Sequence, residues 1–331
     1  MTETSGTRPS LKKRVMRTAA RALGGPVGLA AMLLLRLSSR KAGVALMYHS
    51  VEHRAGDPAL ELVPPHHADV FEAQVRHVSR HYRVVSSSEL QAAAAARRRG
   101  ERFPVAITFD DDLACHSEIA LPILVRNGAR ATFFLSGASL ERPFAFWYER
   151  LQRASDERVG GLARLVLGGE GDGQASLHDL ALAIEELHPE ERDAVAARLG
   201  EAVGPDPPDA GIRSEQVRAL AEAGMTVGFH TMRHDALSLL DDQRLAAALV
   251  DGRDRLAEAA GGDVDVIGYP HGRADERVAD AAREAGFTAG FTTRENAVTP
   301  ASNPLLQGRM GPSLRSSGAL ALQLPLTLRR A

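Results

Sequence analysis

The segment Val105-Ala106-Ile107-Thr108-Phe109-Asp110-Asp111-Asp112 places five residues typical of a buried strand directly before three carboxylates. A short apolar run of this kind predicts a strand that is covered on both faces. Adjacent acids repel one another and a fold gains nothing from that repulsion, so the triplet predicts a functional loop at the carboxyl end of a strand. The alternatives are a solvated acidic turn, or Asp112 as the N-cap of a following helix.

Similar apolar runs recur on both sides of this segment. The predicted strands cover residues 44–48, 82–85, 105–109, 131–135, 225–229, 264–268 and 287–292. Helical spacing of apolar residues predicts the later helices at 214–223, 241–259 and 274–285. Strands separated by helices imply parallel strands with right-handed crossovers. We therefore expect an α/β fold, a distorted (β/α) barrel of about seven parallel strands, rather than two small domains.

Residues 141–212 interrupt this alternation. They are rich in Glu, Arg, Ala and Gly and end near Pro207-Pro208, which predicts a helical insertion. The domain limits follow from the same pattern. We expect a basic N-terminal arm at 1–42, the barrel at 43–312 and a C-terminal tail at 313–331.

The composition excludes several classes of protein. The 331 residues include 40 Lys and Arg against 42 Asp and Glu, a net charge of −2, so no basic field would attract nucleic acid. An apolar fraction of 44% and a charged fraction of 25% are ordinary for a globular protein. The single cysteine, Cys115, excludes an internal disulfide scaffold and a thiolate zinc cluster.

The charge is nevertheless uneven, because residues 1–43 carry nine basic side chains and one acidic one. The apolar run at 22–35 inside this arm is shorter than the roughly 20 residues that a membrane-spanning helix needs. Residues 37–40 offer no small-x-small cleavage site. We expect a helix packed across one end of the barrel, with peripheral contact to a membrane as the alternative. The expected location is cytoplasmic or peripheral at the membrane, and secretion stays open.

Two further polar clusters follow predicted strands. His230 and His234 lie four residues apart and would face the same way in a helix. Such pairs are often surface histidines, but two imidazoles and a carboxylate from the acidic triplet would complete a three-ligand site for a divalent metal ion. The turn Tyr269-Pro270-His271-Gly272 could direct backbone N–H groups at a developing oxyanion, or could be a plain turn between a strand and a helix.

These clusters together resemble a known family. The segment 107–111, the His230-Thr231-x-x-His234 pair and the Tyr-Pro-His-Gly turn are similar to the polysaccharide deacetylases of the NodB type, carbohydrate esterase family four. The phrases at 46–51 and 131–134 match as well, and the resemblance covers about residues 43–310. The early Tyr48-His49 motif resembles the poly-N-acetylglucosamine deacetylase branch. The resemblance implies a hydrolase that removes acetyl from an N-acetylated sugar in a polysaccharide or glycoconjugate.

The resemblance also implies roles for single residues. Asp110 would be the catalytic base, and the backbone N–H of His271 would stabilise the oxyanion. His49 is expected to be the general acid or a substrate contact, with a core or capping histidine as the alternative. The metal ligands would be Asp111, His230 and His234, holding a divalent ion, in the first place zinc.

The chain departs from the family pattern at three places. Asp112 stands where the family usually has glycine, and Gly268 stands where many members carry an arginine that orients the catalytic aspartate. Arg309 is a candidate replacement, although a surface arginine is the simpler expectation. The usual late histidine acid is absent, because no histidine follows His271.

Other readings stay open. A barrel that binds carbohydrate without turnover, or a metal-dependent hydrolase of a non-sugar amide or ester, would fit the same residues. Among the remaining marked residues, we expect Cys115 and His116 to be structural and His66 and His67 to be solvated. The aromatic patch at 144–148 is expected to anchor the insertion, with stacking on a sugar ring as the alternative.

Overall fold

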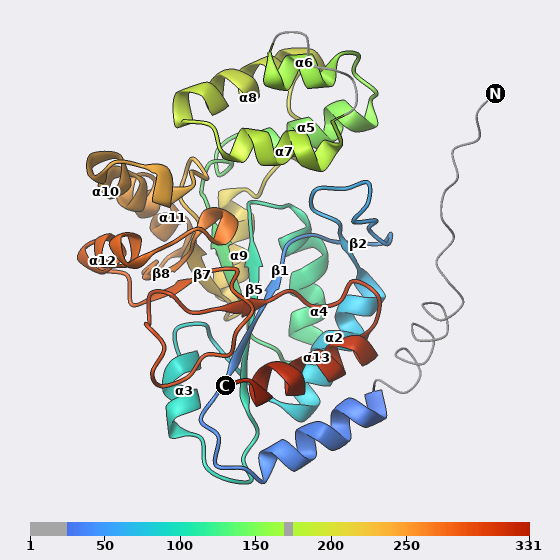
Figure 1. Cartoon of the computed structure of the whole chain (residues 1–331), viewed down its shortest axis with the longest axis vertical. Helices are drawn as coiled ribbons and strands as arrows, with labels where there is room; N and C mark the ends of the chain where they lie inside the picture. Colours follow the sequence, from blue (N-terminus) through green and yellow to red (C-terminus); the bar gives the residue numbers. More distant parts are fainter. Residues whose placement is uncertain (1–24, 169–174) are drawn as a thin grey trace, which may run out of the picture.

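Seven parallel strands follow one another around a nearly closed barrel, with helices outside them (Figure 1). The computed structural model describes residues 25–168 and 175–331. The first 24 residues of the expected arm, and residues 169–174 of the expected insertion, lie outside the described residues. The expected (β/α) barrel is confirmed.

The strands run in the order β10-β1-β5-β6-β7-β8-β9, and β4 pairs at the side of β5. Their bounds are β1 (Val44–Tyr48), β4 (Arg83–Val85), β5 (Pro104–Asp110), β6 (Thr132–Leu135), β7 (Thr226–Phe229), β8 (Val266–Gly268), β9 (Ala289–Phe291) and β10 (Arg309–Met310). The Thr292 N–H donates to the Gln307 carbonyl at 2.8 Å, and this contact links the end of β9 to the chain just before β10. The ring is therefore closed by backbone pairing as well as by packing.

The barrel helices shield the outside of the strands. They are α2 (Ala68–His81), α3 (Leu90–Ala96), a π-helical turn (His116–Ala120) that runs into α4 (Leu121–Arg126), α9 (Ser214–Glu222), α10 (Asp242–Val250), α11 (Arg253–Ala260), α12 (Glu276–Glu284) and α13 (Ser317–Arg329). The single helix expected at 241–259 is wrong, because Gly252 adopts a φ of 80° and separates two helices. A left-handed residue of this kind cannot continue a right-handed helix.

In the described parts of the segment, residues 141–168 and 175–212, four helices sit above one end of the barrel (Figure 1). These are α5 (Trp147–Asp156), α6 (Leu162–Leu167), α7 (Leu177–Glu185) and α8 (Pro189–Val203). They enclose an apolar cluster of their own, in which Leu151, Ile184 and Leu199 are fully buried. This cluster is separate from the barrel core, so the segment is a small packed layer and not a loose loop.

The helix of residues 25–36 and the C-terminal helix α13 pack together at the opposite end of the barrel from these helices (Figure 1). Residues 25–36 form a helix whose Met32 joins the barrel core, as expected for a helix packed across one end. The expected C-terminal tail carries α13, which packs on α2 and contributes Leu320, Leu324 and Leu328 to the same core. Among the described residues, no helix combines the length and the apolar character needed to cross a bilayer.

The expectation that His66 is solvated is wrong. His66 and His67 form β3 (His66–His67), which pairs in parallel with β2 (Val51–Glu52). His66 is 6% exposed, and its ring nitrogen donates to the Pro312 carbonyl at 3.3 Å. This small pairing fixes the loop after β1 beside the barrel mouth.

Candidate metal centre and active site

Three side chains from two strand ends meet at the mouth of the barrel. Asp111 follows β5, and His230 and His234 follow β7. The Oδ1 atom of Asp111 lies 3.5 Å from His230 Nε2 and 3.4 Å from His234 Nε2. Taken together, one ligand atom from each residue lies within 4.8 Å of the others, and all three side chains are buried. The sequence expectation that these residues converge agrees with this geometry.

The two histidines converge by a different route from a helix. Residues 230–234 form an irregular turn, in which Thr231 has a φ of 53° and His234 a φ of 52°. The premise of a shared helical face is therefore wrong for this segment. The His230 Nδ1–H donates to the Gly268 carbonyl at 2.6 Å, which turns its Nε2 toward Asp111. A hydrogen bond of this kind fixes the tautomer and the orientation of a histidine that binds a metal.

The donor set fits a divalent cation. Asp111 Oδ1 is buried and has no hydrogen-bond partner among the described residues, which is costly unless a cation or proton lies against it. Burial alone would raise the pKa of the Asp111 carboxyl, but the neighbouring His230 and His234 imidazoles hold this pKa well below its usual range. Burial lowers the pKa of His234 to about 3. An ionised carboxylate and a neutral imidazole are the forms that bind metals.

Asp110, next to the metal-site carboxylate, is held by a buried arginine. Arg309 is fully buried and donates to both carboxylate oxygens of Asp110, at 2.5 and 2.7 Å. Arg309 also donates to the Thr292 carbonyl at 3.1 Å. The expectation of a surface arginine is wrong: β10 pairs with β1, which places this side chain inside the barrel beside the end of β5.

His49 and His271 lie around the same pair of carboxylates. His49 follows β1 directly, and its Nε2 lies 3.9 Å from Asp110 Oδ2 with the side chain 32% exposed. His116, expected to be structural, is buried and donates from Nε2 to the His49 carbonyl at 3.1 Å. His49 therefore has a fixed backbone and a ring that solvent can reach.

His271 stands in a strained turn after β8. Its φ is 56°, and its backbone N–H has no acceptor among the hydrogen bonds of the described residues. The ring Nδ1 lies 3.4 Å from Glu185 Oε1, at the end of α7. Glu185 is a residue that sequence reasoning missed, because nothing in the sequence of α7 marks its last carboxylate as the one that reaches the barrel.

Comparison with known proteins places this site in a family. Residues 97–290, more than half of the chain, match the family described as polysaccharide deacetylase. The chain belongs to the polysaccharide deacetylase family. The family consists of metal-dependent hydrolases that act on the N-acetyl amides of carbohydrates. The family resemblance and the hydrolase class expected from the motifs are both confirmed.

One curated relative is YxkH of Bacillus subtilis (strain 168), with 27% identity over 88 residues. The match covers 27% of this chain and 32% of YxkH, so it spans about a third of the relative's length. The similarity is limited to a part of YxkH, so it does not indicate the substrate of the present protein.

Solved structures of polysaccharide deacetylases share the fold. The deacetylase PplD of Streptococcus pyogenes, in complex with acetate, superposes with a TM-score of 0.57 at 18% identity, covering 86% of this chain and 98% of that one. IcaB from Ammonifex degensii gives a TM-score of 0.54 at 17% identity, covering 87% and 98%. At such low identities the likeness concerns the fold.

The departures from the polysaccharide deacetylase pattern have local explanations. Gly268 leaves no room for a side chain, because a Cβ there would press on the ring of Phe134. Asp112 is no helix cap: it is buried and accepts hydrogen bonds from the backbone and hydroxyl groups of Ser136 and Ser139. Asp112 thus connects the loop after β5 to the segment that follows β6 by hydrogen bonds.

The insertion helices hold and cover the polysaccharide deacetylase site. Arg192 of α8 forms a buried ion pair with Asp235, the residue after the second histidine. A cavity of about 320 Å³ at the site is lined on one side by the barrel and on the other by the insertion. Its walls include His49, Asp110, Asp111, Trp147, Tyr148, His178, Glu185, His230, His234 and His271.

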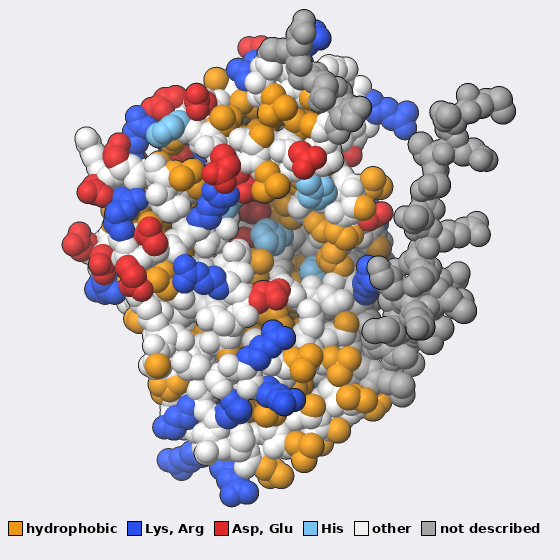
Figure 2. All heavy atoms as spheres, in the orientation of Figure 1, with side chains coloured by type: hydrophobic (Ala, Val, Ile, Leu, Met, Phe, Trp, Pro, Cys, Tyr) orange, Lys and Arg blue, Asp and Glu red, His pale blue; other side chains and the backbone are white. Residues whose placement is uncertain are grey.

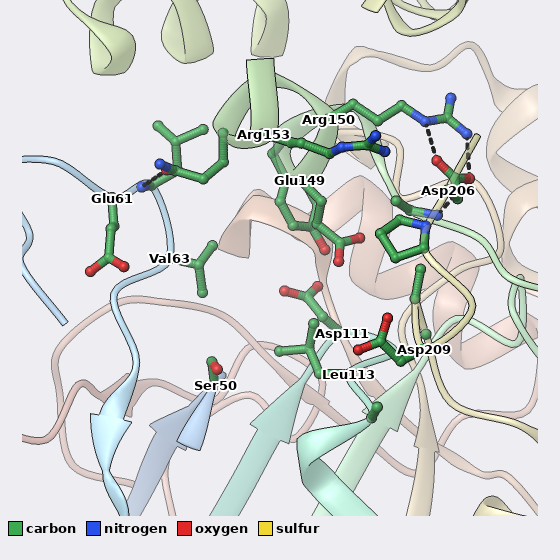
Figure 3. Close-up of a pocket in the computed structure, with 18 of the residues that line it drawn as sticks. Ser50, Glu61, Val63, Asp111, Leu113, Glu149, Arg150, Arg153, Asp206 and Asp209 are labelled. Atoms are coloured by element: carbon green, nitrogen blue, oxygen red, sulfur yellow. Dashed lines mark hydrogen bonds and ion pairs between the residues drawn. The ribbon is translucent and has the colours of Figure 1, made fainter. Parts of the chain in front are cut away.

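A second cavity, of about 490 Å³, lies on the other side of Asp111 (Figure 3). The carboxylates of Asp111, Glu149 and Asp209 project into it, while Arg150 is bound to Asp206 at its edge. Asp111 and Tyr148 line both cavities. The two spaces therefore meet at the candidate metal centre.

The aromatic patch anchors the insertion, as expected, and two of its side chains also face the site. Phe146, Trp147 and Tyr148 are buried in the apolar cluster of the insertion, which makes them anchors. Trp147 and Tyr148 also line the cavity at the site, and the indole Nε1 and the phenol hydroxyl have no hydrogen-bond partner among the described residues. Buried donors without partners are rare in proteins, which sets these two groups apart in the wall of the cavity.

Proposed function

We propose that this protein is a metal-dependent deacetylase that hydrolyses the N-acetyl amide of a sugar residue in a polysaccharide or glycoconjugate. The observation that carries the proposal is the meeting of Asp111, His230 and His234 around an unpartnered carboxylate oxygen, beside an Asp110 fixed by Arg309. Membership of the polysaccharide deacetylase family supports the reaction class.

The metal ligands in this proposal are Asp111, His230 and His234. Two imidazoles and one carboxylate suit zinc and leave an open coordination position. When bound, such an ion supplies Lewis-acid polarisation of the acetamide carbonyl and lowers the pKa of water. The hydrogen bond from His230 Nδ1 to the Gly268 carbonyl keeps the ligand nitrogen in place.

Asp110 is proposed as the general base. Water adds to the acetamide carbonyl carbon, and its proton passes to the Asp110 carboxylate. Arg309 holds both oxygens of that carboxylate and keeps it ionised: burial would raise the pKa of Asp110, but the Arg309 charge, with His230, lowers it below its usual value. An oriented and ionised Asp110 carboxylate is the form that can accept the proton of the attacking water.

The remaining roles fall to His271 and His49. The unbonded backbone N–H of His271 is proposed to donate to the oxyanion that forms on the carbonyl oxygen. When the C–N bond breaks, the leaving amine needs a proton, and His49 is proposed to deliver it. Its distance of 3.9 Å from Asp110 and its partial exposure let it reach the substrate nitrogen.

Release of acetate from N-acetylglucosamine oligomers, a lipid-linked N-acetyl sugar and a small N-acetyl glycoside tests the proposal. We expect release that stops with a chelator and returns with zinc. Asp110→Asn should lower turnover by about 10² to 10⁴, the usual contribution of a general base, while metal analysis finds the ion still bound. Asp209→Asn, which changes a carboxylate of the neighbouring cavity, is the matched control and should stay active.

Two outcomes would contradict the proposal. If sugars bind but no acetate is released under any metal, the protein is a carbohydrate-binding barrel. If acetate comes only from acetyl esters or from non-sugar amides, the site chemistry is correct and the substrate class is wrong.

A further inference from the structure

The helix of residues 25–36 has two apolar faces. One face packs on the barrel through Leu29, Met32 and Leu35, with Met32 2% exposed. The other face points outward and carries Val27, Leu33 and Leu34, and Leu37 extends it just after the helix; these residues are 55%, 49%, 72% and 58% exposed. Helices of globular proteins normally place polar side chains on the outer face, so an apolar outer face indicates a second partner.

This helix is firmly attached to the barrel, so its outward face is a fixed surface. Arg97 is 3% exposed and donates to the carbonyls of Arg36, Ser38 and Arg40, at 2.9, 3.1 and 2.7 Å. At the other end, Gly28 lies so close to the α13 backbone at Ala321 that a Cβ would overlap it. The helix therefore cannot roll to bury its outer face against the barrel.

The segments that contact this helix are rich in basic residues. The Gly100 N–H donates to the Arg36 carbonyl, and Arg40 bonds the backbone of Ala331, so the loop before β5 and the end of α13 both lie against this helix. The basic side chains carried by these three segments are Arg36, Arg40, Lys41, Arg98, Arg99, Arg102, Arg329 and Arg330. Glu101 stands among them. In Figure 2 the apolar and basic side chains gather at the lower end of the molecule.

We propose that this face, which we call the basal face, docks on an anionic phospholipid surface. An apolar strip rimmed by arginine and lysine inserts side chains at the level of the headgroups while the cations meet lipid phosphates. Charge complementarity favours this occupant over a second copy of the chain, because two such basic faces would repel each other. The protein as a whole carries a net charge of −2, so the positive charge is local to this end.

Docking in this way would point the catalytic mouth away from the lipid. The helix precedes β1 and the loop precedes β5, so both lie at the amino ends of the strands, whereas Asp110 and Asp111 lie at the carboxyl end of β5 (Figure 1). The inference does not depend on the proposed function, because lipid binding is measured without a substrate.

Co-sedimentation of the full chain with vesicles tests the proposal. Vesicles of phosphatidylcholine with phosphatidylglycerol should carry the protein into the pellet, and vesicles of phosphatidylcholine alone should not. Binding should weaken as salt rises, because the interaction is screened. The double variant Leu34→Glu/Leu37→Glu should lose binding, while Val250→Glu, at a residue 50% exposed on α10, should bind as the wild type does.

A charge variant tests the rim separately. Arg98→Gln/Arg99→Gln/Arg102→Gln should weaken partition, since each basic group near an anionic surface contributes about a five-fold factor. Thermal unfolding of each variant confirms that the fold is intact.

Three results would overturn the proposal. One is a wild-type protein that stays in the supernatant with anionic vesicles. Another is a dimer in solution that the double leucine variant dissociates, which would assign the face to a second copy. The third is binding gained only after deletion of residues 1–24, which would assign the face to that segment.

Discussion

The barrel and the insertion hold their buried acids in different ways. In the barrel, Asp110 is paired with Arg309, and Asp112 accepts four hydrogen bonds from Ser136 and Ser139. In the insertion, Glu149 accepts one hydrogen bond from the Phe146 backbone, and burial raises its pKa to about 8. The barrel thus compensates the acids at the site, whereas the described part of the insertion leaves Glu149 without a cation and pairs Asp206 with Arg150 at the edge of the second cavity.

This difference indicates a division of labour. The groups proposed for chemistry all lie at the carboxyl ends of barrel strands: Asp110 ends β5, Asp111 follows it, and His230 and His234 follow β7. The insertion approaches them from above through Trp147, Tyr148 and Glu185. Substitutions in the barrel should therefore affect the chemical step strongly, and substitutions in the insertion should modulate rate or stability.

The largest effect is expected from Arg309. Arg309→Met leaves the Asp110 carboxylate buried without its partner, which typically costs about 3 to 5 kcal/mol of stability. Catalysis should fall by about 10²-fold, the lower end of a general base's contribution, because the base loses its orientation. Arg309→Lys keeps the positive charge but not the bidentate contact with Asp110, so its stability and its rate should lie between those of the wild type and Arg309→Met. Acetate release and urea unfolding measure both effects.

Arg253→Met is the matched control for this prediction. Arg253 also lies in the barrel, where it donates to the carbonyls of Val264 and Ala285, but it has no contact with the site. Its loss should reduce stability and leave the rate of the folded enzyme unchanged. Equal rates for Arg309→Met and Arg253→Met would show that Arg309 has only a structural role.

The sequence predicts the barrel well because its signal is local. Apolar runs between helices indicate parallel strands, and the carboxyl ends of such strands meet at one mouth, so the convergence of Asp111 with His230 and His234 could be predicted. The sequence offers Arg309 only as a candidate partner of Asp110 beside the simpler expectation of a surface arginine, because β10 is a two-residue strand without an apolar run. Its burial follows from pairing with β1, a contact between distant parts of the chain.

The contacts of the insertion with the barrel are also difficult to predict from the sequence, because they join distant parts of the chain. Its helices could be predicted from composition, but the contact between Glu185 and His271 joins two distant segments that have no shared pattern. Likewise, the turn that brings His230 and His234 together depends on positive φ angles, which the sequence does not indicate at Thr231. Tertiary contacts determine these details.

A smaller effect is expected from Glu185, the carboxylate through which the insertion contacts the proposed oxyanion turn. Glu185→Gln removes the charge facing His271 Nδ1 at 3.4 Å, which loosens the ring and the strained backbone that it helps to fix. We expect kcat to fall about ten-fold, as for other residues that orient an active group, with KM and metal content unchanged. Glu185→Asp should restore part of the loss.

Glu186→Gln is the control for Glu185. Glu186 is the next residue along the chain and pairs at 2.6 Å with Arg273, which also lies 3.6 Å from Glu185, whereas it is Glu185 that pairs with His271. It should have wild-type kcat. A change in KM alone for Glu185→Gln would indicate that the residue contacts the substrate and does not position the turn.

The smallest effect is expected from Glu149, and it concerns stability. Burial raises the pKa of Glu149 from 4.5 to about 8 in the folded protein. Between pH 4.5 and pH 8 the folded protein binds more protons than the unfolded chain, so the free energy of unfolding decreases as the pH rises through this range. Glu149→Gln keeps an oxygen for the Phe146 N–H without titrating, and should be more stable than the wild type at pH 8.5 by about 1 to 2 kcal/mol.

Urea unfolding at pH 5 and pH 8.5 measures this difference. Glu157→Gln, at the exposed end of the same helix, removes an i,i+4 pair with Arg153 and should leave the slope with pH unchanged. If Glu149→Gln unfolds with the same dependence on pH as the wild type, the carboxyl is already ionised at neutral pH. The insertion would then hold a compensated charge as the barrel does, and the contrast between the two regions would be confined to their catalytic groups.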